Sequence, residues 1–206
     1  MILETPTALP TQTATLIHRP ASFFEPLELD ELFSAPQPLE VELGAGDGSF
    51  LANYAARHLD RNFLGVERLL GRLRKIDRKG LRGGLRNLRL IRVEASYLIQ
   101  YLLPSESVAA LHVYFPDPWP KRKHRKNRLV NAAFVELARA VLKPVGTVFL
   151  RTDDADYFTQ MTEVFRASSA FSAIPTPPEL AEVTTDFERE FQARGVPTLR
   201  VAYQRR

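Results

Sequence analysis

The segment VELGAGDGSF, residues 41–50, constrains the fold of this chain more than any other stretch. Its three glycines, Gly44, Gly46 and Gly48, lie between a strand-like apolar run and a segment with helical periodicity. Glycine takes left-handed backbone conformations at little cost, so this spacing lets a strand turn sharply into a helix and approach a ligand closely. A strand–turn–helix unit of this kind is typical of parallel α/β sheets.

Strand-like and helical segments alternate along the rest of the chain. Strands are expected at residues 39–43, 63–66, 88–93, 108–115, 147–151 and 198–204. Helices are expected at residues 49–57, 130–142 and 154–166, and a basic helix carries Leu69, Leu73 and Ile76 on its inner face. The alternation predicts an α/β fold: a doubly wound, mostly parallel seven-stranded sheet with helices on both faces.

The length and composition favour one domain preceded by an arm. The chain has 206 residues, 45% of them hydrophobic, which is enough for a substantial core. Residues 1–37 are rich in Pro and Thr with weak periodicity and are expected to form a partly ordered arm, while residues 38–206 form the domain. No segment approaches the roughly 20 apolar residues that span a bilayer, and no signal pattern is evident. We expect a cytoplasmic protein; the oligomeric state stays open, with a monomer slightly favoured.

The residues that commonly bind metals are missing or scattered. The chain has no cysteine, which excludes disulfides, thiolate metal sites and a cysteine nucleophile. Its four histidines show no metal-ligand spacing. We therefore expect no metal to be needed.

Positive charge is concentrated in two regions. Residues 68–92 hold ten basic residues and one acid, Asp77, and residues 121–128 hold six basic residues and no acid. These regions contain sixteen of the 28 lysines and arginines, although the net charge is only +4. Two such runs beside one candidate site favour a polyanionic partner over two solvated faces.

Acidic residues mark the first strands and the glycine turn. Glu42 lies in the first strand, Asp47 in the turn, and Glu67 ends the second strand 19 residues after Gly48, where an acid can bind both ribose hydroxyls. A nicotinamide dinucleotide usually has a GxGxxG turn and a helix N-terminus that faces the pyrophosphate. Here the third glycine comes one residue early and acids surround the turn. This favours S-adenosyl-L-methionine, a cationic ligand without phosphate, over the dinucleotide, with Glu94 near the adenine.

Asp117 lies between two prolines in the segment FPDPWPKRKHRKNR, residues 115–128. Pro116 and Pro118 fix their own φ angles and restrict the residues before them, so Asp117 has few conformations. The strand that precedes it is expected beside the first strand, at the point of a doubly wound sheet where ligands bind. We interpret Asp117 as a rigid acid at the mouth of the donor pocket rather than an ordinary surface acid in a turn.

Several motifs, in order, resemble the bacterial tRNA (guanine-N7-)-methyltransferases: ELGAGDG, GVE, FPDPWPK, RTDD and TDFE. The resemblance runs from about residue 39 to the C-terminus. It implies a class I, Rossmann-like methyltransferase fold that uses S-adenosyl-L-methionine, with a guanine in the variable loop of tRNA as the substrate.

The resemblance also implies roles for individual residues. The donor-site positions are Glu42, Gly44, Gly46, Gly48, Glu67, Glu94 and Asp117. The positions assigned to the substrate are Lys121, Asp153, Thr185, Asp186, Phe187 and Glu188. Asp117 is in addition the proposed catalytic acid. Two residues depart from the family: Glu94 is longer than the usual acid, and Asn127 stands where a basic residue is common.

The chemistry of guanine N7 agrees with these residues. N7 carries an in-plane lone pair, so it can attack a methyl group without losing a proton, and neither a strong base nor a metal is required. The task is mainly alignment. Asp117 can stabilise the positive charge that moves onto the purine, or hold the guanine edge as an acceptor.

Two other functions remain open on sequence grounds. Methyltransferases that act on exocyclic amino groups often carry a (D/N)PP(Y/F/W) motif at the same strand end, but Asp117 displaces the second proline here. An RNA-binding module that has lost catalysis is the second alternative, and the acids at positions 42, 67 and 117 argue against it. The methylated atom and the binding of labelled donor distinguish these functions.

Overall fold

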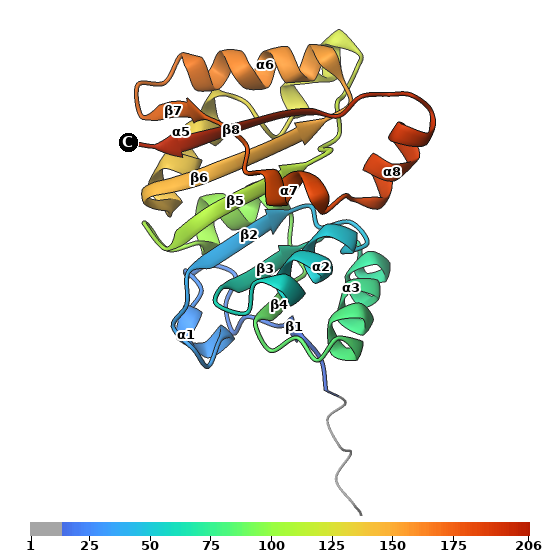
Figure 1. Ribbon diagram of the computed structural model, residues 1–206. Coiled ribbons are helices and arrows are strands. Elements are labelled where there is room, and N and C mark those ends of the chain that lie inside the picture. Colours follow the sequence, from blue (N-terminus) through green and yellow to red (C-terminus); the bar gives the residue numbers. More distant parts are fainter. Residues whose placement is uncertain (1–13) are drawn as a thin grey trace, which may run out of the picture.

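The computed structural model describes residues 14–206, whose strands form one mostly parallel sheet (Figure 1). The strand order is β1-β4-β3-β2-β5-β6-β8-β7, and β8 runs antiparallel to both of its neighbours. The strands are β1 (Ile17–His18), β2 (Leu39–Leu43), β3 (Asn62–Val66), β4 (Leu88–Ile91), β5 (Val108–Tyr114), β6 (Leu142–Thr152), β7 (Phe171–Ile174) and β8 (Leu199–Arg205). The predicted doubly wound α/β class is confirmed.

The predicted number of seven strands is wrong, because residues 14–206 contain eight. Neither β1 nor β7 was located from the sequence; β1 has only two residues and pairs with Leu90 and Ile91 of β4. A strand this short carries no alternation of its own and exists through its partner. Residues 1–13 of the predicted arm lie outside the described residues, and the division at residue 37 stays a prediction.

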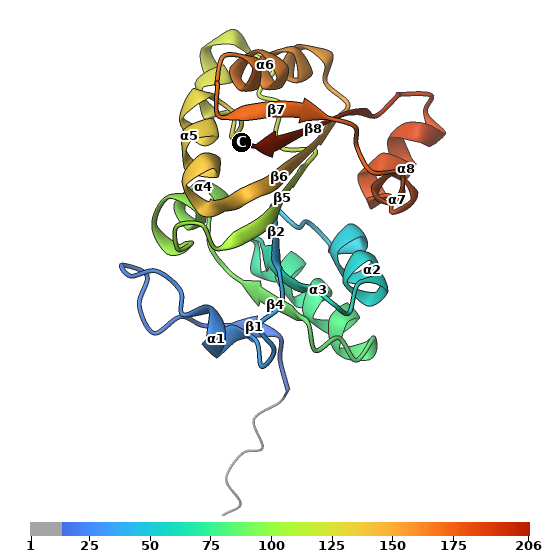
Figure 2. The ribbon, with the colours of Figure 1, turned by 60° about the vertical axis from the view of Figure 1, so that its left-hand side comes forward.

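Helices cover both faces of the sheet. They are α1 (Leu29–Leu32), α2 (Ser49–Arg57), α3 (Leu70–Arg82), α4 (Ala95–Tyr97), the π-helix η1 (Leu98–Leu102), the 3₁₀ helix η2 (Arg122–Asn127), α5 (Ala132–Val141), α6 (Ala155–Arg166), α7 (Pro178–Glu182) and α8 (Asp186–Ala193). Figure 2 shows α4 and α5 on one side of the sheet and α2, α3, α7 and α8 on the other. The buried apolar side chains divide accordingly into two clusters, one on each face.

The amphipathic helix α3 shows how the sequence positions these layers. Leu73 and Ile76 are fully buried, as their helical spacing predicts. Leu69 was expected on the same inner face, but it precedes the first helical residue and is 45% exposed. The basic residues of α3 other than Lys79 are exposed, and the N-terminus of the helix lies where β3 ends.

The parallel strands bring the candidate residues to one edge. β2 lies between β3 and β5 and runs parallel to both. The connections after β2 and β5 leave toward opposite faces of the sheet, so a crevice opens between these two strand ends. The glycine turn follows β2 and the FPDPW segment follows β5, as expected from the sequence.

Candidate active site

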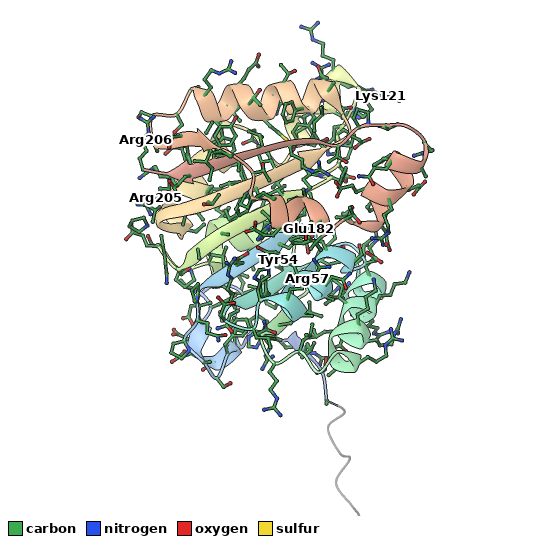
Figure 3. All side chains as sticks on the ribbon, in the orientation of Figure 1. Tyr54, Arg57, Lys121, Glu182, Arg205 and Arg206 are labelled. Carbon is green, nitrogen blue, oxygen red and sulfur yellow. The ribbon has the colours of Figure 1, made fainter. Side chains whose placement is uncertain are left out.

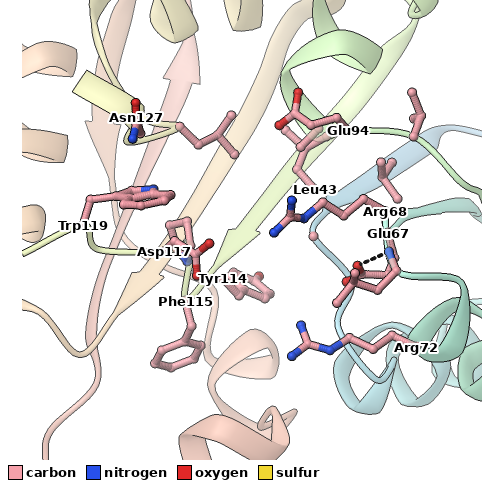
Figure 4. A pocket seen from close by; sticks show the side chains of 17 residues that line it. Leu43, Glu67, Arg68, Arg72, Glu94, Tyr114, Phe115, Asp117, Trp119 and Asn127 are labelled. Atoms are coloured by element: carbon pink, nitrogen blue, oxygen red, sulfur yellow. Dashed lines mark hydrogen bonds between the residues drawn. The ribbon is translucent and has the colours of Figure 1, made fainter. Parts of the chain in front are cut away.

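A cavity of about 400 Å³ opens at the carboxyl ends of β2, β3, β4 and β5 (Figure 4). Four of the sequence-predicted residues lie on its wall: Gly44, Glu67, Glu94 and Asp117. Figure 4 shows Asp117 on one side of the cavity, with Glu67 and Glu94 on the other. We call the side formed by residues 43–44, 66–72 and 93–95 the acidic wall, and the side formed by residues 114–119, 127 and 129 the loop wall.

The glycine turn requires glycine for two different reasons. Gly44 has φ +84° and a Cβ there would meet nothing within 4 Å, so this backbone borders open space. Gly48 has φ +74°, and a Cβ would lie 2.7 Å from the side chain of Ile76. The turn is held to β3, because the amides of Gly44 and Ala45 donate to the Val66 carbonyl at 3.0 and 2.8 Å. Gly46 and Gly48 shape the turn but do not line the cavity.

Glu42 is buried beneath the turn rather than on the cavity wall. Its side chain is only 3% exposed, and its Oε2 has no hydrogen-bond partner in the described residues. Burial raises the pKa of Glu42 to about 8; the Arg151 guanidinium opposes this shift, and the negative charges of Asp47 and Glu67 add to it. A buried carboxyl group with an unsatisfied oxygen is costly, and a cationic ligand group would satisfy it.

The two acids of the acidic wall, Glu67 and Glu94, differ in how freely they can bind a ligand. Glu67 is 5% exposed and its Oε1 accepts from the Leu69 amide at 2.8 Å. This bond orients the carboxylate at the start of α3. Glu94 is exposed and caps α4, with Oε2 accepting from the Tyr97 amide at 3.1 Å and from the Ser96 hydroxyl. Part of the Glu94 carboxylate is thus already engaged.

The backbone of the loop wall is strained on both sides of Asp117. Phe115 and Trp119 have φ angles of +51° and +44°, in the left-handed region that favours glycine. Such residues cost on the order of 1–3 kcal/mol each and persist only where surrounding contacts hold them. Asp117 itself is exposed, between Pro116 and Pro118. The prolines predicted a rigid loop, but the strain at Phe115 and Trp119 could not be read from the sequence.

A buried polar chain, which sequence reasoning missed, runs beneath the loop wall. The Nδ1 of His112 lies 2.8 Å from the Tyr114 hydroxyl and its Nε2 lies 2.7 Å from Oε2 of Glu40. Glu40 Oε1 accepts from Arg61 at 2.7 Å. Burial would raise the pKa of Glu40, but the hydrogen bonds and charges of His112 and Arg61 hold it below its usual value. The signal available was a second acid in the first strand and a histidine in the neighbouring strand.

The residues predicted to bind the substrate do not line the cavity. Lys121 is exposed at the start of η2, beyond the end of β5 (Figure 3), and Asp153 is half-buried after β6. Thr185 caps α8 by accepting from the Glu188 amide at 3.0 Å. Asp186 and Phe187 are exposed on the first turn of α8.

Glu188 is the exception within this group, because it is fully buried. Its Oε2 accepts from Arg151 at 2.9 Å, and its Oε1 pairs with Arg200. Arg151 in turn donates to the Val183 carbonyl at 2.9 Å and lies 4.2 Å from the centre of the Tyr114 ring. Glu188 is therefore placed to fix the position of the α7–α8 segment, and a direct contact with substrate would require this segment to move.

The start of α8 packs against the glycine turn. The Asp186 amide donates to the Ser49 hydroxyl at 2.9 Å. A second hollow of about 340 Å³ between α2, α3 and α8 is lined by Ser49, Lys79 and Asp186, among others. Lys79 is held there by an ion pair with Asp47 at 2.8 Å. The TDFE motif is thus connected to the turn that borders the cavity.

The other residues that line the cavity include four that were not singled out for it and can contact a ligand: Arg68, Arg72, Trp119 and Asn127. Arg68 and Arg72 belong to the first basic region, and Asn127 is the departure noted from the family. Arg68 and Arg72 follow the end of β3, and Trp119 and Asn127 follow the end of β5. Within residues 14–206, no cluster of three potential ligands could hold a metal ion, and no helix is long and apolar enough to cross a membrane.

Comparison with known proteins agrees with this architecture. A family model described as "Putative methyltransferase" matches residues 36–201. A tRNA (guanine-N(7)-)-methyltransferase of Thermotoga maritima is 33% identical over 174 residues, which are 84% of this chain and 56% of that protein. The chain thus spans little more than half the length of that relative. The corresponding protein of Halorhodospira halophila is 34% identical over 184 residues, 82% of this chain and 75% of the relative.

Solved structures agree at the level of the fold. The 16S rRNA methyltransferase KamB superposes with a TM-score of 0.64 at 16% identity, covering 86% of this chain and 92% of that one. The resemblance drawn from the motifs is confirmed by the sequence relatives: the chain belongs to the tRNA (guanine-N(7)-)-methyltransferase family.

Proposed function

We propose that this protein transfers a methyl group from S-adenosyl-L-methionine to N7 of a guanine in tRNA. The observation that carries the proposal is the cavity at the ends of β2 and β5, with Glu67 and Glu94 on one wall and Asp117 on the other. In a chain of this family, that arrangement supports a donor pocket on one wall and a catalytic acid on the other.

The residues present fit the donor. S-adenosyl-L-methionine supplies a methyl group made electrophilic by a positively charged sulfur. The unsatisfied Oε2 of Glu42 can accept from the donor's ammonium group, if that group reaches past Gly44. Glu67 can accept from the ribose hydroxyls with the oxygen that the Leu69 amide leaves free. Glu94 follows the end of β4, where the adenine is expected.

The remaining residues fit a nucleic-acid substrate. Arg68 and Arg72 are exposed at the edge of the cavity, and η2 presents the second basic region beside the loop wall. Such residues contact phosphates and position the RNA without reading its sequence. Lys121, Asp153 and residues 185–187 do not line the cavity and stay candidates for substrate contacts.

Asp117 acts on the guanine in this proposal. Guanine N7 loses no proton during the reaction, so a strong base is not required. Positive charge moves onto the purine, and the Asp117 carboxylate can stabilise this charge or hold the guanine edge. The catalytic contribution is therefore mainly alignment and preorganised charge.

Finer parts of the proposal concern the biological context. The variable loop of tRNA is the proposed location of the guanine, the cytoplasm is the proposed compartment, and the oligomeric state stays open, with a monomer slightly favoured. These come from the family resemblance and the composition of the chain.

One assay tests the proposal. Labelled methyl transfer to bulk unmodified tRNA, followed by nucleoside analysis, should yield 7-methylguanosine. A tRNA whose variable-loop guanine has been replaced serves as the matched control and should accept no label. Label on an exocyclic amino group would favour the alternative methyltransferase, and donor binding without any transfer would favour an inactive RNA-binding module.

A further inference from the structure

We propose that Arg128 is a positioning residue: its buried guanidinium holds the strained loop that carries Asp117, and thereby sets the rate of methyl transfer rather than ligand affinity. The inference rests on the proposed role of Asp117. Arg128 touches neither donor nor guanine in this proposal, and it acts only through the loop.

All three nitrogen atoms of the Arg128 guanidinium donate hydrogen bonds. Its Nε donates to the Pro118 carbonyl at 2.7 Å, in the centre of the loop. Its Nη1 donates to Gln160 Oε1 at 2.9 Å, and its Nη2 donates to Asp156 Oδ2 at 2.6 Å. Gln160 and Asp156 both belong to α6, so one side chain ties the loop to that helix.

The α6 residues that contact the Arg128 guanidinium are themselves held by burial and hydrogen bonds. The guanidinium carbon lies 4.7 Å from the centre of the Tyr157 ring, and Tyr157 is fully buried. The Tyr157 hydroxyl accepts from the Val130 amide at 2.8 Å, and Gln160 Nε2 donates to the Val130 carbonyl at 3.0 Å. The segment after η2 and the helix α6 are thus joined around the arginine, which is only 2% exposed.

The loop needs an external hold because of its conformation. The Pro118 carbonyl lies between the two strained residues, Phe115 and Trp119, and one residue from Asp117. Within residues 14–206, no side chain donates a hydrogen bond to the Asp117 carboxylate, so its position depends on the backbone alone. A hydrogen bond from a charged donor is roughly twice as strong as a neutral one, which suits this role.

A purely structural role would be served better by another residue. Burying a guanidinium costs desolvation free energy, and an apolar side chain of similar volume would fill the space at lower cost. What an apolar side chain lacks is a donor aimed at the Pro118 carbonyl. Lysine keeps the charge but lacks the planar fork, so it cannot reproduce three bonds in these directions.

The chain contains a natural reporter for this loop. Trp119 is its single tryptophan, half-buried in the same loop. Quenching of its fluorescence by acrylamide needs neither donor nor tRNA. In Arg128→Lys we expect more rapid quenching than in the unchanged protein. Arg166 is an exposed arginine at the end of α6, and the control variant Arg166→Lys should be quenched like the unchanged protein.

Kinetics then separate positioning from stability. For Arg128→Lys we expect kcat to fall by about 10- to 100-fold, the range that a misplacement of 1 Å can produce. KM for tRNA and Kd for the donor should change by less than about threefold, an amount worth under 1 kcal/mol. All measurements are made at a temperature where thermal unfolding shows that the variant and the unchanged protein are both folded. Asp156→Asn is the milder second variant, because it weakens the hydrogen bond to Arg128 from an exposed position. It should show a smaller effect of the same kind.

A double-mutant cycle decides whether Arg128 acts through Asp117. On an Asp117→Asn background, Arg128→Lys should cost little further in kcat, because groups that act as one unit are not additive. Multiplication of the two losses would overturn the inference, as would unchanged kcat or unchanged quenching in Arg128→Lys. The quenching result stands even if the substrate of the enzyme proves to be different, so failure of the proposed function and failure of this inference are distinguishable.

Discussion

The acidic wall and the loop wall of the cavity differ in what fixes their side chains. On the acidic wall, Gly44 and Glu67 are held by backbone groups at the ends of paired strands: the Gly44 amide donates to the Val66 carbonyl of β3, and the Glu67 carboxylate accepts from the Leu69 amide. On the loop wall, Asp117 lies in a strained segment whose carbonyl is held by Arg128, which α6 supports from below. One wall is held by backbone hydrogen bonds between neighbouring strand ends, and the other by a side chain that a separate helix supports.

This difference has a functional consequence. A wall held by backbone bonds between strand ends is complete once its strands are paired, so it suits the binding of a donor before the substrate arrives. A strained loop held from a distance suits a group that must meet the reacting atom in one orientation. Changes in the acidic wall should therefore appear mainly in donor affinity, whereas changes in the loop wall should appear mainly in kcat.

The largest expected effect concerns Asp117. Asp117→Ala should lower kcat by on the order of 100-fold, comparable to removing one preorganised electrostatic group elsewhere, while donor binding is largely kept. Sulfur is cationic in the ground state and the purine becomes cationic only as the methyl group moves, so the loss falls on the transition state. Steady-state kinetics and donor calorimetry on the same preparation provide the check.

The asparagine variant at this position separates two roles. Asp117→Asn keeps an acceptor oxygen and loses the charge. If it restores most of the rate, Asp117 positions guanine by hydrogen bonding; if it is as poor as alanine, the charge carries the effect. Loss of donor binding in both variants would make Asp117 a donor-site residue and remove the contrast between the walls.

The matching change in the acidic wall is Glu67→Ala. It should weaken donor binding by about 1.5–3 kcal/mol, as expected for the loss of hydrogen bonds to a charged group. The kcat at saturating donor should change far less. Calorimetry that finds equal affinity before and after the change would remove Glu67 from the ribose role, and a kcat loss as large as that of Asp117→Ala would break the comparison.

The acidic wall was also the better predicted of the two from sequence. The glycine turn and helical periodicity gave β2 and α2 with their observed bounds, because both elements follow from neighbouring residues. The expected strand order alone predicted that Glu67, Glu94 and Asp117 lie at the same end of the sheet. β7 was missed, because a strand of four residues at the sheet edge carries too little alternation to be recognised.

What could not be predicted depends on residues far apart in the sequence. Arg128 appears in a basic run that favours phosphate contacts, yet it is buried against residues 28 and 32 positions later. Glu188 belongs to a motif assigned to the substrate, yet it is buried against Arg151, 37 positions earlier. A charged residue in a motif does not reveal whether it faces solvent or supports the site from inside.

A third prediction concerns the pH dependence of donor binding through Glu42. Its pKa of about 8 in the free protein leaves the carboxyl mostly neutral at pH 7. A donor ammonium group favours the carboxylate and lowers this pKa, so binding releases a proton and donor affinity rises with pH up to about 8. The slope should not exceed about tenfold per pH unit, the limit for one proton. Calorimetry in buffers of different ionisation enthalpy measures the release, and Glu42→Gln should abolish it; proton uptake on binding would contradict this role.

The smallest expected effect concerns the basic residues beside the loop wall, where η2 presents Lys123 and Lys126 to solvent. Arg125 on the same helix is paired with Asp156 at 3.0 Å, whereas neither lysine forms an ion pair within residues 14–206, which leaves both available to phosphates. Each phosphate contact releases counterions, so replacing the two lysines by alanine should lower the slope of log K against log salt by up to about 0.9 per contact removed.

Lys143→Ala, a change at an exposed lysine near the opposite ends of the strands, is the matched control and should leave the slope unchanged. Because these contacts position the RNA backbone and not the reacting atoms, kcat at saturating tRNA should be kept. An unchanged slope would mean that Lys123 and Lys126 only face solvent, and a large loss of kcat would mean that the loop wall extends into η2.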